Sequence, residues 1–264
     1  MKIWSVSNQK GGVGKTTTVV TLGGLLASWG YDVLLVDLDP HGSLTSYFQL
    51  NPDTVERSVY NLFLDAGAKK KLDAAPYIVK TDFKGLSLLP ASTAIATLDR
   101  KTALIEGMGL VVANSLGSVK TRFDYVLIDS PPMLGVLMIN ALAACECLIV
   151  PVLTEFLALK GLERMLHTLE MVHHSRKSPI NYVIVPTQFD RRTSASVNSL
   201  EELRERYPDH VWDGVIPVDT KIRDASAEGI PAPQYHPGSR AVMAYANLLE
   251  TLTREEDQHA AAMG

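Results

Sequence analysis

The feature that most constrains the fold is a glycine-rich segment, Gln9–Thr17 (QKGGVGKTT), between a short apolar run and an apolar stretch with helical spacing. Glycine allows positive φ and a close approach of the backbone to a polyphosphate. The N–H groups of such a loop at a helix N-terminus form an anion site. In a loop ending Gly-Lys-Thr, the lysine reaches the β- and γ-phosphates and the threonine hydroxyl binds Mg²⁺. We therefore predict a phosphate-binding loop with Lys15 and Thr16 in these roles.

Short apolar runs alternate with segments of helical spacing along the chain. Near-continuous apolarity is typical of parallel strands covered on both faces. The alternation predicts an α/β P-loop NTPase fold, with a mostly parallel, twisted sheet and helices on both faces. The predicted strands are Ile3–Ser7, Val33–Val36, Leu86–Leu89, Tyr125–Ile128, Cys147–Val150, Tyr182–Val185 and Val211–Ile216. The predicted helices are Lys15–Trp29, Ile95–Leu116, Gly135–Ala143, Phe156–His173, Ser196–Tyr207 and Ser239–Thr253.

The length and composition indicate one domain over residues 1–264, with residues 51–93 as an irregular insertion and residues 254–264 as a frayed tail. Lys and Arg number 25 against 29 Asp and Glu, a formal charge of −4, which argues against coating nucleic acid by bulk charge. Cys145 and Cys147 lie too close in a strand to pair, so no disulfide scaffold is expected. No secretory leader or long uncharged apolar span is visible, and we expect a cytoplasmic protein.

Carboxylates follow two of the predicted strands. Asp37 and Asp39 end the second strand before a proline, and Asp129 ends another before Ser130 and two prolines. In open α/β sheets, ligands bind at the carboxyl ends of the strands. Asp129 therefore fits the role of holding Mg²⁺, and Asp37 and Asp39 lie on the same side of an extended chain near it.

The pattern KGGVGKTT resembles the deviant Walker A signature of the ParA/MinD family of ATPases. The resemblance implies a partner-stimulated ATPase that forms an ATP-dependent homodimer. Lys10 then reaches the phosphates of the other subunit, Asp39 orients the attacking water, and Asp37 assists the Mg²⁺ site. The residues expected to cradle the phosphates of ATP are Lys10, Gly11, Gly12, Val13, Gly14, Lys15, Thr16 and Thr17.

The resemblance extends to the segments Pro186–Thr193 and Ile216–Arg223. It implies that Thr187, Pro217, Val218 and Asp219 surround the base of the nucleotide. In partition-type members, the positions of Arg192 and Lys221 bind DNA non-specifically. Residues 190–223 contain six basic and seven acidic residues, which is a poor footprint for phosphate contacts, so DNA binding stays open.

The chain departs from the family pattern at two places, with His41 where the family has Gln and Ser130 where it has Cys or Thr. The end of the chain, Glu250–Gly264, lacks the basic amphipathic helix of MinD-type members, so no direct membrane insertion is expected. The short ParA/Soj form remains, which implies partition of a chromosome or plasmid, or positioning of polar chemotaxis arrays as in the ParC-like subgroup. The alternative is a metabolic ligase that resembles dethiobiotin synthetase.

Overall fold

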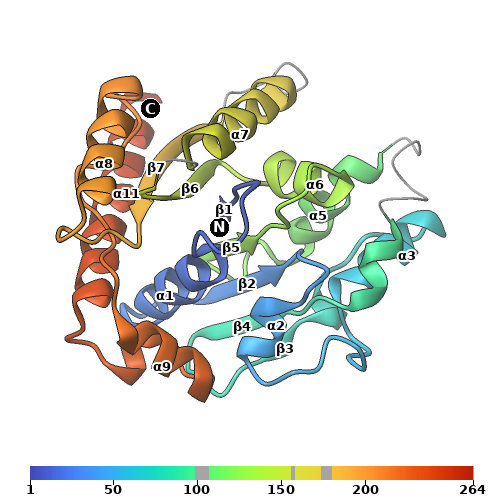
Figure 1. Cartoon of the computed structure of the whole chain (residues 1–264). Helices are drawn as coiled ribbons and strands as arrows, with labels where there is room; N and C mark the ends of the chain where they lie inside the picture. Colours follow the sequence, from blue (N-terminus) through green and yellow to red (C-terminus); the bar gives the residue numbers. More distant parts are fainter. Residues whose placement is uncertain (99–106, 156–157, 174–179, 264) are drawn as a thin grey trace.

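A computed structural model describes residues 1–98, 107–155, 158–173 and 180–263 (Figure 1). Its centre is a seven-stranded sheet with the order β3-β4-β2-β5-β1-β6-β7. All neighbouring strands are parallel except β3, which runs antiparallel to β4. The strands are β1 (Lys2–Val6), β2 (Val33–Asp37), β3 (Val79–Lys80), β4 (Leu86–Leu89), β5 (Tyr125–Asp129), β6 (Cys147–Leu153) and β7 (Asn181–Thr187). The predicted α/β P-loop fold is confirmed.

Helices cover both faces of this sheet (Figure 1). They are α1 (Lys15–Ser28), α2 (Ser43–Tyr47), α3 (Val59–Gly67), α5 (Val111–Leu116), α6 (Val136–Ala144), α7 (Ala158–His173), α8 (Ser194–Arg206), α9 (Thr220–Glu228), α10 (Ala232–Tyr235) and α11 (Arg240–Met263). Alternate strand residues point to opposite faces. In β2, Leu35 packs on the side of α1 and α11, whereas Leu34 packs on the side of α3, α5 and α6. The sheet is therefore buried on both faces, which explains its near-continuous apolar strands.

Two predicted elements are wrong. Residues 211–216 form no strand, and only isolated bridges link Ile184 to Val211 and Phe189 to Pro217. The predicted helix Ile95–Leu116 is interrupted, because Gly107 takes a φ of 85° before the short 3₁₀ helix Met108–Leu110 and α5. Its residues 99–106 lie outside the described residues, as do residues 156–157 at the predicted start of α7.

Residues 51–93 are more regular than the sequence suggested. Within them, β4 pairs with β2 in the sheet, and α3 begins at a capping box where Ser58 and Asn61 exchange side-chain and backbone contacts. The segment therefore supplies strands and a helix to the main sheet instead of an irregular insertion. At the other end, α11 continues as helix through residues 254–263, where the sequence predicted a frayed tail.

Within the described part of the chain, no helix is long and apolar enough to cross a membrane.

Candidate functional site

The glycine-rich loop connects β1 to α1 at the carboxyl edge of the sheet. Gly12 and Gly14 have φ of 74° and 93°, the left-handed region that glycine adopts without strain. A Cβ at either position would meet no protein atom within 4 Å, so the space above the loop is open. No side chain caps the N-terminus of α1 at Gly14. The first N–H groups of α1 are therefore oriented as an anion site.

The loop is fixed from the opposite side by β7. The Thr187 hydroxyl donates to the carbonyl of Val13 at 2.9 Å, and the Gln188 amide donates to the carbonyl of Gly12 at 2.9 Å. Thr187 was expected near the nucleotide base. The structure places it, buried, beneath the phosphate loop, and its place beside the base stays a prediction. Gln188 takes a φ of 52°, and its role was not predicted because it depends on a contact 176 residues away in sequence.

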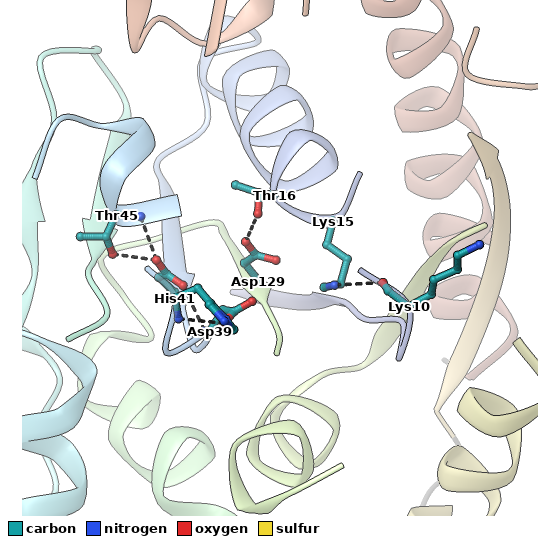
Figure 2. A network of polar contacts seen from close by, with 8 residues as sticks. Lys10, Lys15, Thr16, Asp39, His41, Thr45 and Asp129 are labelled. Carbon is teal, nitrogen blue, oxygen red and sulfur yellow. Dashed lines mark hydrogen bonds and ion pairs between the residues drawn. The ribbon is translucent and has the colours of Figure 1, made fainter. Parts of the chain in front are cut away.

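Lys15 is a buried cation at the start of α1 (Figure 2). Its Nζ lies 3.4 Å from the carbonyl of Lys10 and, within the described residues, belongs to no ion pair. Burial lowers the pKa of Lys15, while the charges of Asp129 and Asp39 act in the opposite direction. Burying a cation is costly unless an anion compensates it. The geometry therefore suits a ligand that brings negative charge to the loop.

Asp129 and Thr16 lie beside Lys15. The Thr16 hydroxyl donates to Asp129 Oδ2 at 2.6 Å, whereas Asp129 Oδ1 is buried and has no hydrogen-bond partner among the described residues. Burial raises the pKa of the Asp129 carboxyl, and the nearby charge of Asp37 raises it further. Mg²⁺ prefers oxygen ligands and is usually held by one or two carboxylates together with substrate phosphates. The unpartnered carboxylate oxygen beside a threonine hydroxyl therefore fits Mg²⁺.

Asp37 lies directly across from Asp129, because the register of β2 and β5 pairs these two residues. Its Oδ2 accepts hydrogen bonds from the Thr45 hydroxyl at 2.7 Å and the Thr45 N–H at 2.8 Å. Burial raises the pKa of Asp37 to about 7, and the hydrogen bonds from Thr45 only partly offset this effect. Both ends of the carboxylate are thus engaged, since the N–H of Asp39 donates to Oδ1. This arrangement leaves Asp129 as the more direct metal ligand.

Asp39 follows β2 and faces the lysine side of the site (Figure 2). Its charge acts on Lys15, and its side chain contacts His41. The Lys10 side chain is directed away from Lys15 (Figure 2). Its Nζ pairs with Glu155, which follows β6. The ammonium group of Lys10 therefore lies away from Lys15, although its backbone belongs to the phosphate loop. The contact with Glu155 was not predicted, since the two residues are 145 positions apart.

Pro217, Val218 and Asp219 line a cavity of about 410 Å³ beyond the end of β7. Asp219 accepts hydrogen bonds from the N–H groups of Lys221 at 3.0 Å and Ala241 at 3.1 Å, so its carboxylate joins the starts of α9 and α11.

The two cations expected to contact DNA are each paired within the chain. Arg192 makes two hydrogen bonds to Asp190, at 2.9 and 2.7 Å, and Lys221 lies 3.1 Å from Asp224. Asp190 and Arg192 lie between β7 and α8, whereas Lys221 and Asp224 lie on α9.

Comparisons with known proteins agree with this geometry. Residues 1–182 match the model of the AAA domain family. The chain is 36% identical to the sporulation initiation inhibitor protein Soj of Bacillus subtilis, over 94% of this chain and 96% of that protein. It is 33% identical to the chromosome partitioning protein ParA of Caulobacter vibrioides, over 99% of this chain and 98% of that protein. The chain belongs to the ParA/Soj family of ATPases.

A solved structure of a related protein also resembles this ParA/Soj-family chain over nearly its whole length. Cobyrinic acid a,c-diamide synthase from Mycobacterium smegmatis, with bound ATP analog and magnesium, has a TM-score of 0.82 and 32% sequence identity to it. The match covers 97% of this chain and 96% of that chain. That related protein thus binds an ATP analogue and Mg²⁺ on the same fold.

Proposed function

We propose that this chain is a Mg²⁺-dependent ATPase that acts as a dimerising switch and positions or segregates cargo. One observation carries the proposal: within the described residues, Lys15 is a buried cation that belongs to no ion pair, and beside it the buried Asp129 Oδ1 has no hydrogen-bond partner. A nucleoside triphosphate with its metal satisfies both groups at once. Membership of the ParA/Soj family supports ATP as that nucleotide.

The reaction follows from the positions of the side chains. The phosphate chain lies on the loop and the N-terminus of α1, where the N–H groups and Lys15 hold the β- and γ-phosphates. Thr16 and Asp129 would hold the metal, with Asp37 behind them. Mg²⁺, when bound, neutralises charge on the transferred phosphoryl group. Asp39 orients a water molecule for in-line attack on the γ-phosphate, so positioning and charge neutralisation supply the catalysis.

The switch depends on a second copy of the chain. The Lys10 side chain is directed away from Lys15, which suits a cation that acts on the phosphates of a partner subunit. Such a cation stabilises the transition state as an arginine finger does. A partner or adaptor protein then accelerates hydrolysis and opens the dimer.

Membership of the family indicates the general kind of cargo. Partition of a chromosome or plasmid fits the names of the relatives Soj and ParA, and positioning of a polar chemotaxis array is the second form of the same activity. If the chain binds DNA non-specifically, Arg192 and Lys221 would have to exchange their contacts with Asp190 and Asp224 for contacts with DNA phosphates.

A second candidate is an ATP-dependent ligase. It is favoured by the diamide synthase whose structure is 32% identical to this chain. A synthase that takes its nitrogen from glutamine needs a nucleophile such as a cysteine thiol. Cys145 and Cys147 lie at the amino end of β6, whereas the phosphate loop follows the carboxyl end of the parallel strand β1. The two cysteines and the phosphate loop therefore lie at opposite edges of the sheet. The ligase would therefore depend on free ammonia or on another protein for its nitrogen.

Two substitutions test the ATPase. We expect Asp39→Ala to keep ATP affinity and ATP-dependent dimers while losing turnover about 100-fold or more, because the water is no longer oriented. Lys15→Ala should lose nucleotide affinity, since the phosphates lose their buried cation. Asp53→Ala removes an exposed carboxylate and is the control. Phosphate release and nucleotide binding are measured with ATP and Mg²⁺ alone, and again with an acid and ammonia.

Wild-type turnover in the Asp39→Ala variant would contradict the proposed role of Asp39. Turnover that starts only when the acid and ammonia are present would favour the ligase instead.

A further inference from the structure

A tight turn follows β2 at the edge of the site. The N–H of Gly42 donates to the carbonyl of Asp39 at 2.8 Å, which closes a turn of four residues. Pro40 fixes φ at the second position of this turn, and Gly42 takes a φ of 62° at its end. A Cβ on Gly42 would lie 2.6 Å from the Pro52 side chain, so the turn is also packed against its surroundings. The backbone at Asp39 is therefore held rigidly.

Within this turn, His41 folds back onto Asp39 (Figure 2). The backbone N–H of His41 donates to Asp39 Oδ1 at 3.0 Å, and the ring Nδ1 lies 2.8 Å from the same oxygen. The side chain of His41 is 80% exposed, whereas that of Asp39 is 13% exposed. In the described part of the chain, Asp39 Oδ2 accepts no hydrogen bond. One oxygen is thus fixed by His41, and the other is left for a ligand.

We propose that His41 is a positioning residue for Asp39, and this inference rests on the proposed role of Asp39 in orienting the attacking water. Rotation of an aspartate carboxylate about χ2 is broad, so a single backbone hydrogen bond holds it only loosely. The second donor, on a ring anchored by the same turn, selects one orientation. That orientation keeps Oδ1 turned toward His41 and presents Oδ2 to the water.

Because His41 is exposed, the effect of its removal on catalysis can be separated from an effect on folding stability. Its ring packs into no core, so its removal should cost little folding free energy. The loss should instead reduce the fraction of time in which Oδ2 is aligned for attack. Such a loss lowers kcat and leaves the KM for ATP unchanged, because ATP is held by the phosphate loop.

Substitution of His41 by asparagine tests whether the hydrogen bond to Asp39 matters, or any other property of the histidine. The side-chain nitrogen of Asn occupies nearly the same place relative to Cβ as Nδ1 of His. His41→Asn therefore keeps a donor toward Asp39 Oδ1, and His41→Ala removes it. His167 on α7 is a matched control, because it is 73% exposed and lies 3.8 Å from Glu170, far from the turn in sequence.

The experiment measures steady-state ATP hydrolysis and the melting temperature for wild type and for His41→Ala, His41→Asn, His167→Ala and Asp39→Ala. We expect His41→Ala to lower kcat about tenfold at unchanged KM and melting temperature. His41→Asn should recover most of the rate, and His167→Ala should behave as wild type. A kcat for His41→Ala within about twofold of wild type would overturn the proposal, as would an Asn variant as slow as the Ala variant.

The Asp39→Ala variant separates the two proposals. If it hydrolyses ATP at the wild-type rate, the proposed function of Asp39 fails. If it is inactive while His41→Ala is fully active, only the role of His41 fails.

A spectroscopic measurement tests the contact without turnover. In wild type, the neutral imidazole of His41 should carry its proton on Nδ1, as seen in long-range ¹H–¹⁵N spectra assigned with the His41→Asn variant. Asp39→Ala should shift this ring to the Nε2–H form. A ring that already carries its proton on Nε2 in wild type would overturn the contact.

Discussion

At the scale of single residues, Asp37 shows how burial favours the protonated form of a carboxyl in the site. Its carboxyl is fully buried, and burial raises its pKa to about 7 despite three hydrogen bonds from Thr45 and Asp39. Asp129 lies opposite in the register and also has a raised pKa. Near neutral pH, two facing carboxylates thus resist full ionisation together. A bound cation supplies the charge that lets both lose their protons.

This predicts a pH-dependent stability for the metal-free protein. A carboxyl with a raised folded pKa stabilises the folded chain fully below its unfolded pKa, and this stabilisation is lost as the pH rises through the folded pKa. For Asp37 the window runs from about 3.8 to about 7. We expect the melting temperature of wild type minus that of Asp37→Asn, measured in EDTA, to fall by several degrees between pH 5 and pH 8. A difference independent of pH would contradict the assignment.

The sequence identifies the residues whose role depends on local pattern. Lys15 and Thr16 follow from the glycine-rich loop, and Asp129 from its place at a strand end. Thr45, Gln188 and Glu155 carry no such signal, because each acts through a partner brought close only by folding. The contact of Thr187 with the phosphate loop carries no such signal either, since it depends on the adjacency of β7 and that loop.

At the scale of elements, α2 and the end of α9 are joined by two side chains. The Tyr47 hydroxyl donates to the carbonyl of Ile230 at 2.9 Å, and the Gln49 amide donates to the carbonyl of Glu228 at 3.2 Å. Between them, Gly229 ends α9 with a φ of 69°. The segment after β2 is thereby tied to the helix that begins at Asp219, beside the cavity.

We expect Gly229→Ala to break this junction. Its Cβ would lie 2.9 Å from the carbonyl oxygen of Tyr47, and the positive φ strains any side chain there. The loss should be about 1–3 kcal/mol of unfolding free energy. Gly67→Ala, where a Cβ meets nothing within 4 Å, is the control and should be neutral or stabilising. Denaturant unfolding of both variants checks this, and equal stability of the two would argue against the strain.

The sheet could be predicted from sequence much better than the helices around it. Strands buried on both faces leave continuous apolar runs, and these were found. The short helices α2 and α9 lack a long apolar period, so no helix is predicted there from sequence. Residues 211–216 have a strand-like composition, yet they meet β7 only at separate points, a bridge from Val211 to Ile184 and a hydrogen bond from the Ile216 N–H to the carbonyl of Pro186, and form no continuous ladder. Their apolar side chains, such as Trp212 and Ile216, fill the core without entering the sheet.

At the scale of the whole molecule, the ion pair between Lys10 and Glu155 bears on the proposed dimer. Their ion pair is partly exposed, with 28% and 51% of the side chains accessible, so it contributes little to stability. It holds the Lys10 ammonium group away from Lys15. Formation of the proposed dimer would exchange this carboxylate for the phosphates of the partner subunit.

We expect Lys10→Ala, in an Asp39→Ala background that blocks hydrolysis, to lose the ATP-dependent dimer. Glu155→Ala frees the lysine and should retain or strengthen dimerisation. Lys160→Ala, an exposed lysine on α7, is the control. Light scattering coupled to sizing chromatography with ATP and Mg²⁺ gives the masses. A full dimer in Lys10→Ala would rule out the proposed role of this lysine.

The pairing of Asp37 with Asp129 across β2 and β5 also determines where the chain can tolerate changes of length. Residues point alternately to the two faces of a strand, so one extra residue within β2 would turn every later side chain to the other face. The carboxylate would then enter the core, away from the phosphate loop. Insertions in the connections between strands leave the pairing intact. Connections remote from the phosphate loop and from the turn after β2 can therefore change in length, whereas the interiors of β2 and β5 must keep a fixed number of residues.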